Sequence, residues 1–280
     1  MEPPENPGGE LPKPARKLLE TVTQAIGPLP LSLGVPSAEE WVDSTLAAAP
    51  IGVVGRARRR VEGREILRQA NCEAIVVLAL AELPAEVSDE AVEPGWVVRF
   101  FGLAQDVARP EFQHIWARLL AAEVANPQSS STRTLHTLGM MDAWEVEGFE
   151  AYCAFSFAFE SGGRFMIADD AARTEMRGYL SGDDLTQHFI DSGLLSAELE
   201  QRRVLPARGL RIGYAAKRYQ LAKPQPEFEE RFFCYRPFTR VGQQLASALR
   251  AKTFYGYARN VFRVLQVERG ISFQEITDGQ

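Results

Sequence analysis

The stretch from Pro110 to Pro127, PEFQHIWARLLAAEVANP, is the clearest structural signal in this chain of 280 residues. Its large apolar side chains recur at the three- and four-residue spacing of one helix face: Phe112, Ile115, Trp116, Leu119 and Leu120. Proline is tolerated in the first turn of a helix but not in its interior, so Pro110 and Pro127 bound the pattern. The spacing predicts a helix over 111–124 that buries Trp116 in a core of helices.

Helical patterns also lie on both sides of this stretch. They predict helices over 15–26, 38–48 and 58–83, one around Trp96–Leu103, and further helix from Ser131 to Phe157. Residues 1–14 contain five prolines, three glutamates and two glycines, a composition typical of a disordered tail. We therefore expect a disordered tail over 1–14 and a helical domain over 15–160.

The pattern changes after Gly162-Gly163. From Leu210 to Lys217 the residues alternate with a period of two, which predicts a half-buried strand. Phe232 to Tyr235 predict a second strand, the intervening KPQPEFEE predicts a wing-like loop, and Thr239 is placed to cap a following helix. The predicted fold class is mainly α, with the N-terminal helical domain followed by an α+β module over 161–280.

This C-terminal part resembles the second half of a winged-helix domain. In that family a short helix is followed by a two-stranded wing and by a helix that opens with Leu-Thr-x-x-Gly-x-x-Leu. Here the short helix is 183–195, and the opening motif is Phe238-Thr239-Arg240-Val241-Gly242-Gln243-Gln244-Leu245. The resemblance covers about seventy residues. It implies a winged-helix-like module that binds DNA or docks on a protein.

Charge is unevenly distributed along the chain, although the net formal charge is only −6. Residues 69–200 have 7 basic and 22 acidic side chains, whereas residues 201–270 have 15 basic and 4 acidic ones. A basic block of this kind attracts phosphates. The candidate residues for contacting a nucleic-acid backbone or another anion lie on or beside the predicted strands: Arg211, Lys217, Arg218, Arg231, Arg236 and Arg240.

The sequence leaves the partner of this basic block open. The helix over 183–195 has three aspartates and no lysine or arginine, so it is a poor reader of base edges. Nonspecific backbone contact or docking on an acidic protein is therefore favoured over sequence-specific reading. The block equally fits docking on the acidic middle of its own chain or of a partner subunit. A separate arginine cluster over 56–68, interleaved with Glu62 and Glu65, is interpreted as one solvated helix face.

A further pattern lies in the middle of the chain. It consists of Trp96 with Phe100-Phe101, then Gln113-x-x-Trp116-Ala117-x-x-Leu120-Ala121-x-Glu123, then Pro127 and Ser131-Thr132-Arg133-Thr134-Leu135. This pattern resembles the signature of an uncharacterised bacterial family, a domain of unknown function. The departures are Gly95 in place of an acidic residue and Gln128 in place of glycine. The resemblance implies a bacterial accessory protein in a mobile-element or phage-defence context.

The motif residues Trp96, Trp116, Glu123 and Arg133 are predicted to be structural. A carboxylate near a helix C-terminus is disfavoured by the helix dipole unless it meets a cation. We therefore predict an ion pair between Glu123 and Arg133 across the Asn126-Pro127 turn. The alternative is an anion site at the next helix start, formed by Ser129–Ser131 with Arg133 and His114.

No catalytic residue, metal site or cofactor is predicted. The three histidines have neither H-x-x-x-H nor H-x-H spacing, and no phosphate-binding glycine motif occurs. The paired carboxylates Asp169-Asp170 and Asp183-Asp184 fall at predicted helix starts, where capping explains them. An enzyme assembled from distant residues, such as a nuclease, stays an alternative.

The cysteine spacing, the N-terminal sequence and the length of the apolar runs favour a cytoplasmic location. The three cysteines form no C-x-x-C pair, the N-terminus has no signal-peptide pattern, and no apolar run reaches the roughly 18 residues of a membrane helix. We expect a non-enzymatic bacterial binding protein whose basic module contacts a nucleic-acid backbone or an acidic protein partner. One alternative is an interaction or effector component of a phage-defence or mobile-element system, in which the helical domain forms a homo-oligomer or engages a partner. The other alternative is the undetected enzyme.

Overall fold

The computed structural model describes residues 11–29, 52–180, 182–204, 209–222 and 231–276. The chain divides into two compact units, unit 1 over residues 1–139 and unit 2 over residues 140–280. Within the described ranges, no helix is both long enough and apolar enough to cross a membrane.

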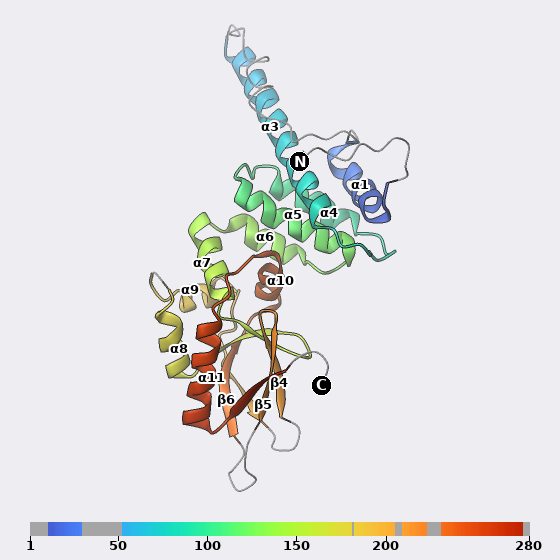
Figure 1. Ribbon diagram of the computed structural model, residues 1–280. Helices are drawn as coiled ribbons and strands as arrows, with labels where there is room; N and C mark the ends of the chain where they lie inside the picture. The colour runs from blue at the N-terminus through green and yellow to red at the C-terminus, as the bar shows by residue number, and fades with distance from the viewer. Residues whose placement is uncertain (1–10, 30–51, 181, 205–208, 223–230, 277–280) are drawn as a thin grey trace. The chain divides into compact units, whose positions relative to one another are not determined.

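Unit 1 is built from helices (Figure 1). They are α1 (Lys13–Ile26), α3 (Gly52–Glu82), α4 (Pro94–Ala104), α5 (Pro110–Ala125) and α6 (Thr132–Met140), which ends at the unit boundary. The helices predicted over 15–26, 58–83 and 111–124 are confirmed. The helix predicted over 38–48 and residues 1–10 of the predicted tail lie outside the described residues. Lys13 already belongs to α1, so this helix begins inside the stretch expected to be tail.

The core of unit 1 forms around α5, which packs on α3 and α1. The side chains of Trp96, Phe100 and Trp116 are at most 4% exposed. Trp96 stacks on Phe100 with ring centroids 5.2 Å apart, and Phe100 meets Trp116 edge to face at 5.3 Å. Burying aromatic rings in this way is a large apolar contribution to stability, so Trp96 and Trp116 act as packing residues.

Unit 2 combines helices and strands. The helices are α7 (Ala143–Cys153), α8 (Asp170–Arg177), α9 (Thr186–Asp191), α10 (Arg240–Ala248) and α11 (Tyr255–Arg269). The strands are β1 (Phe157–Phe159), β2 (Arg164–Ile167), β3 (Glu200–Val204), β4 (Leu210–Tyr214), β5 (Lys217–Ala222), β6 (Arg231–Pro237) and β7 (Ser272–Ile276). They form one seven-stranded antiparallel sheet in the order β3-β6-β2-β1-β4-β5-β7. The fold class is therefore mixed α and β, which corrects the expectation of a mainly α chain.

The predicted two-stranded wing is not formed by the strands expected to make it. β4 pairs with β1 and β5, whereas β6 pairs with β2 and β3, so two strands separate β4 from β6. The alternation over 210–217, predicted to be one strand, spans a hairpin. The chain turns between β4 and β5 at Ala215, which has a positive φ of 49°. The loop KPQPEFEE at 223–230 lies outside the described residues.

The boundary between the units lies between Gly139 and Met140, before the one expected at residue 160. Two features place α7 and β1 in unit 2. α7 packs on α10, and β1 occupies the middle of the sheet, hydrogen-bonded to β2 and β4. The β1–β2 hairpin turns at Gly162 and Gly163, whose φ angles of 89° and 91° favour glycine. The Gly-Gly pair therefore joins two strands of one sheet instead of separating two domains.

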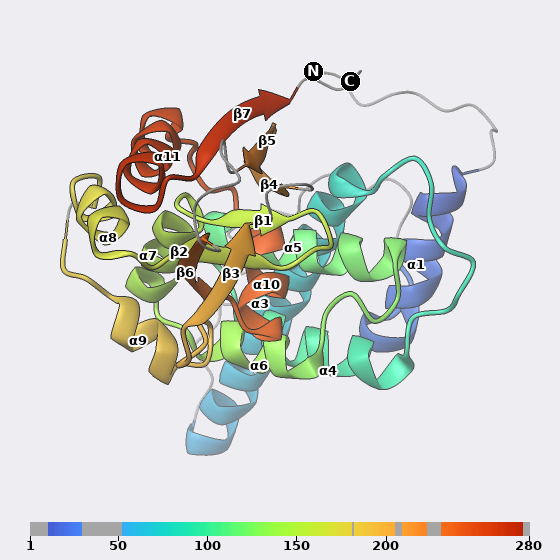
Figure 2. The same cartoon turned by 90° about the horizontal axis from the view of Figure 1, so that it is seen from below.

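One face of the sheet is buried against α11 (Figure 2). Phe157 of β1 lies at its centre, with Phe165, Tyr214, Tyr257 and Phe262 around it at ring-centroid distances of 5.1 to 6.1 Å. All five side chains are at most 2% exposed. Antiparallel sheets often bury one face in this manner and leave the other in contact with water.

Candidate functional site

The other face of the sheet places arginines around a floor of small residues. Residues opposite each other on neighbouring strands share a face, and the register aligns Arg164 of β2, Ala158 of β1, Gly213 of β4 and Arg218 of β5 in one row. Neighbouring strands lie about 4.8 Å apart, so roughly 14 Å separates the Cα atoms of the two arginines. Arg218 is exposed, and Arg164 is half-buried, donating from Nη1 to the Ser156 hydroxyl at 3.2 Å.

A second row adds one more arginine and two amides to this face. Arg211 of β4 lies opposite Gln220 of β5, which in turn lies opposite Gln274 of β7. Arg211 Nε donates to Gln220 Oε1 at 3.2 Å, and its Nη1 lies 3.5 Å from the exposed Glu160 carboxylate. We call the surface formed by Arg164, Ala158, Gly213, Arg218, Arg211, Gln220 and Gln274 the open sheet face.

Lys217 lies on the opposite side of the sheet from Arg218, its neighbour in sequence. It pairs with Tyr214, whose ring is buried, and its Nζ lies 2.7 Å from Glu275 Oε1. The same ammonium sits 5.1 Å from the centroid of the Tyr255 ring. The structure therefore separates Lys217 from Arg211 and Arg218, because side chains alternate along a strand.

The other three predicted residues are not part of the open sheet face. Arg236 of β6 lies opposite Met166, on the same side of the sheet as Arg164, but it is half-buried and its guanidinium donates to the carbonyls of Ser196 and Ala197. Burial, together with the nearby Arg173, lowers the pKa of Arg236, and both side chains line a cavity of about 40 Å³. Arg240 is exposed at the start of α10. Arg231 lies in β6, and its side chain is outside the described part of the structure.

The acidic and basic blocks of the sequence are combined in unit 2. Residues 140–280 contain 18 basic and 19 acidic side chains, because the unit includes acidic residues that precede the basic block. Arg269 Nη2 lies 2.6 Å from Asp169 Oδ1, which is one direct contact between the two blocks. Part of the basic block is therefore neutralised inside its own unit, as the alternative interpretation of the charge pattern expected.

One member of each carboxylate pair, Asp184 and Asp169, has structural partners. Asp184 accepts hydrogen bonds from the Thr186 amide at 3.0 Å and from Tyr152 Oη at 2.9 Å, and Arg177 Nη2 lies 2.9 Å away. Burial opposes ionisation of Asp184, but these hydrogen bonds outweigh it and hold its pKa well below the usual range. Asp169 does not cap α8 with its side chain, contrary to the capping explanation, because its carboxylate binds Arg269 instead.

Metal-ligating side chains and thiols are groups on which catalysis can depend. Among the described residues, no group of three or more His, Cys, Asp or Glu side chains is arranged to hold a metal ion. The thiols of Cys72 and Cys153 are buried, and burial raises the pKa of each to about 12. These two thiols are therefore protonated at neutral pH and are not nucleophiles.

In unit 1, Glu123 binds the turn that follows α5. Its side chain is 2% exposed and accepts from the Gln128 amide at 2.6 Å, the Ser130 amide at 2.7 Å and the Ser129 hydroxyl at 3.0 Å. Trp96 Nε1 donates to the Ser130 carbonyl at 2.7 Å and holds the same turn from α4.

Arg133 is exposed on α6 and is not among the partners of Glu123. The predicted Glu123–Arg133 ion pair is therefore wrong. Hydrogen bonds from backbone amides of the turn stabilise the carboxylate, a role that the prediction assigned to a guanidinium. In the anion site expected at the start of α6, the Ser129 hydroxyl and the Ser130 amide already donate to this buried carboxylate.

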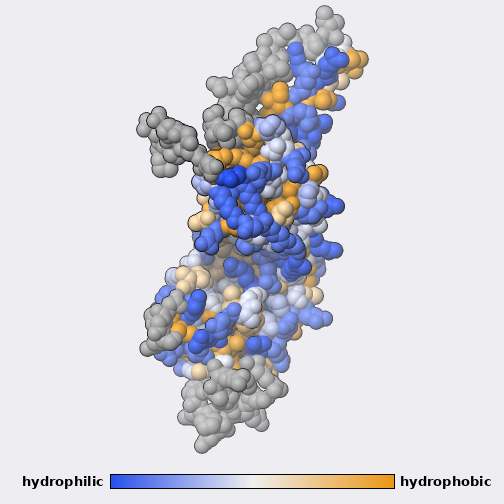
Figure 3. All heavy atoms as spheres, turned by 90° about the vertical axis from the view of Figure 1, so that its right-hand side faces the viewer, coloured by the Kyte–Doolittle hydropathy of each residue, from blue (hydrophilic) through white to orange (hydrophobic). Residues whose placement is uncertain are grey.

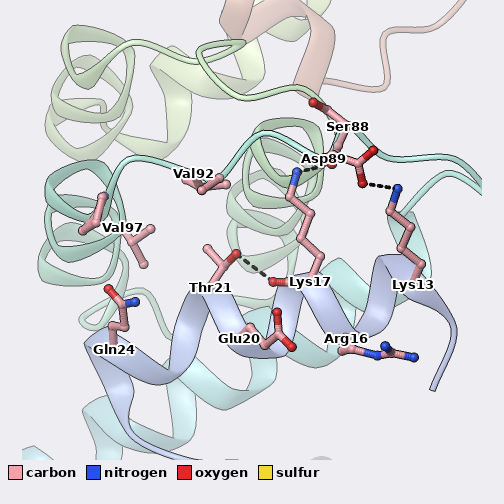
Figure 4. Close-up of a pocket in the computed structure, with 12 residues that line it drawn as sticks. Lys13, Arg16, Lys17, Glu20, Thr21, Gln24, Ser88, Asp89, Val92 and Val97 are labelled. Atoms are coloured by element: carbon pink, nitrogen blue, oxygen red, sulfur yellow. Dashed lines mark hydrogen bonds and ion pairs between the residues drawn. The ribbon is translucent and has the colours of Figure 1, made fainter. Parts of the chain in front are cut away.

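A cavity of about 380 Å³ lies in unit 1 between α1 and the segment that leads into α4 (Figure 4). Lys17 donates from Nζ to the Ser88 carbonyl at 2.7 Å, and Lys13 forms an ion pair with Asp89. Burial, reinforced by the Lys13 ammonium, lowers the pKa of Lys17. Because both ammonium groups already meet oxygen atoms of this segment, we interpret them as ties that fasten α1.

Sequence reasoning missed Arg164, Gln220 and Gln274 as members of the open sheet face. The available signal was the Gly162-Gly163 pair, which is typical of a hairpin turn and would have predicted a strand starting at Arg164. No local signal links Gln274 to Gln220, because that pairing joins residues 54 positions apart in the chain.

These features define a class of protein: a helical unit followed by a unit with a seven-stranded antiparallel sheet. One face of this sheet is buried against α11, and the other has arginine and glutamine side chains on β2, β4, β5 and β7. The chain belongs to the DUF2806 family, described as a protein of unknown function, whose model matches residues 55–261. The match runs from the first turn of α3 into α11 and includes Glu123 and most of the open sheet face. Searches among curated proteins and among solved structures found no match.

Proposed function

We propose that this protein is a non-catalytic binding protein whose open sheet face contacts the phosphate backbone of nucleic acid. The observation that carries the proposal is the register that aligns Arg164 and Arg218 across Ala158 and Gly213, with Arg211 in the next row. Guanidinium groups bind phosphate oxygens with two parallel hydrogen bonds, which makes arginine well suited to this contact.

The floor of the face supports the same proposal. Ala158 and Gly213 present almost no side chain between the arginines, so a sugar-phosphate backbone can approach the sheet closely. The amide of Gln274 adds a hydrogen-bond donor and an acceptor without adding negative charge, and Gln220 accepts from Arg211 Nε and so orients that guanidinium. Contacts of this kind position a nucleic acid without reading its sequence, so we expect similar affinities for unrelated sequences.

The test is the salt dependence of binding, measured by fluorescence anisotropy with a short labelled DNA duplex and the full chain. Each phosphate contact contributes about 0.9 to the slope of log affinity against log salt. Replacing both Arg211 and Arg218 by Ala should lower the affinity at low salt by about tenfold and reduce the slope by about two.

Lys217→Ala provides the matched control, because it removes a charge next to Arg218 in sequence but on the other face of the sheet. We expect its salt slope to equal that of the wild type. If the wild type binds neither DNA nor RNA at low salt, the proposal is wrong. If Lys217→Ala weakens binding as much as Arg218→Ala, the open sheet face is not the binding surface. Binding to an acidic protein that depends on the same arginines, with no binding to nucleic acid, would assign the surface to the alternative partner.

A further inference from the structure

The N-terminal half of α3 extends beyond the core of unit 1 (Figure 1). All the buried residues of this helix lie between Cys72 and Ala79, and none occurs over 52–71. At 1.5 Å per residue, these twenty residues form a rod roughly 30 Å long. We call residues 52–71 the α3 arm.

Arginines follow one face of the α3 arm. Arg56, Arg60 and Arg64 are exposed and recur every four residues, so their Cα atoms rise in steps of about 6 Å along the helix. Arg68 continues the series at the base of the arm, where its guanidinium binds both carboxylate oxygens of Asp106 at 2.7 and 2.9 Å. That contact fastens the base of the arm to unit 1 and fixes the direction of the arginine row.

The acidic residues of the α3 arm lie on the side away from Arg56 and Arg60, although Glu65 lies 3.3 Å from Arg64 Nε and 3.1 Å from Arg68 Nη1 at the base of the arm. At 100° per residue, Glu62 lies about 160° and Glu65 about 140° around the helix from Arg60. Over residues 52–68 there are six arginines and only these two glutamates. The arm is therefore a cationic surface whose excess charge is concentrated on one side.

The distribution of apolar residues disfavours a membrane surface as the partner. Val53 and Leu67 lie within about 20° of Arg60 around the helix, so apolar and cationic side chains share one face. A helix that lies in a bilayer interface needs these residues on opposite faces and commonly has aromatic anchors. Residues 52–71 contain no aromatic side chain. The top of Figure 3, where the arm ends, shows the same mixture of hydrophilic and hydrophobic surface.

We infer that the α3 arm is a second nucleic-acid contact and binds the phosphates of a duplex along one of its grooves. A helix with side chains is 10–12 Å wide, which matches the roughly 12 Å width of the DNA major groove. Arg56, Arg60 and Arg64 then reach the phosphates that border the groove, with no requirement for base reading. This inference extends the proposed function to a second polyanion-binding surface, but it depends on residues of the other unit.

The test uses the full chain with Arg56 and Arg60 both replaced by Gln, which preserves helix propensity while removing two charges. In the duplex-binding assay, this variant should lose about tenfold in affinity at low salt and about two from the salt slope. The matched control replaces the exposed Arg99 and Arg133 by Gln, removing two charges from the same unit away from the arm. Its salt slope should equal that of the wild type.

The outcomes separate this inference from the proposed function. If the Arg211/Arg218 variant loses binding and the Arg56/Arg60 variant keeps wild-type affinity and slope, the arm is not a contact, whereas the open sheet face stands. If only the arm variant loses binding, the inference stands and the proposed function fails. Loss of sedimentation with phosphatidylserine vesicles in the arm variant, with unchanged duplex affinity, would overturn the inference in favour of a lipid surface.

Discussion

A single buried carboxylate shows how the family motif stabilises unit 1. Glu123 accepts three hydrogen bonds from residues 128–130, and two of the donors are backbone amides that have no helical partner at this turn. The carboxylate therefore acts as a side-chain cap for the segment between α5 and α6. Its negative charge close to the end of α5 is compensated by these amides.

The first prediction concerns this residue. Glu123→Gln places an amide NH2 where a carboxylate oxygen accepts, so at least one backbone donor loses its partner. We expect a loss of about 1–3 kcal/mol in the free energy of unfolding, since that is the cost of an unsatisfied buried polar group. The measurement is denaturant unfolding followed by the fluorescence of the buried tryptophans Trp96 and Trp116.

The Arg133→Ala variant tests whether Glu123 is stabilised by the backbone amides of the turn or by the ion pair with Arg133 that the sequence predicted. Arg133 is exposed, so its truncation should leave the unfolding free energy within about 0.5 kcal/mol of the wild type. Equal destabilisation by Arg133→Ala and Glu123→Gln would restore the ion pair as the main stabilising contact of Glu123.

At the scale of elements, the segment after α9 is held against the start of α10 by hydrogen bonds and close packing. Thr239 caps α10 by accepting from the Gly242 amide at 3.1 Å, and it donates from its hydroxyl to the Gly193 carbonyl at 2.6 Å. A Cβ on Gly242 would lie only 2.0 Å from the Leu194 carbonyl oxygen. The Thr-x-x-Gly motif is therefore explained by contact with the segment that follows α9.

The second prediction tests this close approach. Gly242→Ala should destabilise unit 2 by roughly 1–3 kcal/mol, because a backbone oxygen must move to accommodate the methyl group. Gly63→Ala in the α3 arm is the control, since a Cβ there meets no atom within 4 Å. The control should be neutral or stabilise by about 0.4–1 kcal/mol. Thermal unfolding by circular dichroism measures both, and equal shifts of Tm in the two variants would contradict the close contact.

At the scale of the whole molecule, the position of the unit boundary decides which fragments can fold. A fragment that starts at residue 160 lacks α7 and β1, and β1 is the strand between β2 and β4. Removing it exposes two unpaired strand edges and the aromatic cluster around Phe157. A fragment that starts at residue 140 keeps the complete sheet and its buried face.

The third prediction follows from this comparison. The fragment 140–280 should fold cooperatively and be monodisperse, whereas the fragment 160–280 should aggregate or lack a cooperative transition, because unpaired edges promote association. Thermal melts and light scattering of the two fragments measure the difference. A cooperative, monodisperse 160–280 fragment would contradict the central place of β1 in the sheet.

The sequence alone determined the elements whose signals are local. The helices of unit 1 were predictable because their apolar residues repeat with the helical period over ten or more positions. The cap at Thr239 was predictable because capping depends only on residues within one turn. Membership of an uncharacterised family was predictable from the Trp, Gln and Glu spacing around α5, and the family match confirms it.

Only the tertiary structure decided how the strands pair and which arginines share a surface. β1 and β2 have three and four residues, too few to show a period, and the β4–β5 turn at Ala215-Ala216 contains neither glycine nor proline. Strand order depends on hydrogen bonds between residues far apart in the chain, such as Gln220 and Gln274. A count of charges along the chain predicted a basic block but could not tell which side chains share a face of the sheet. Only the strand register placed Arg218 and Lys217 on opposite faces.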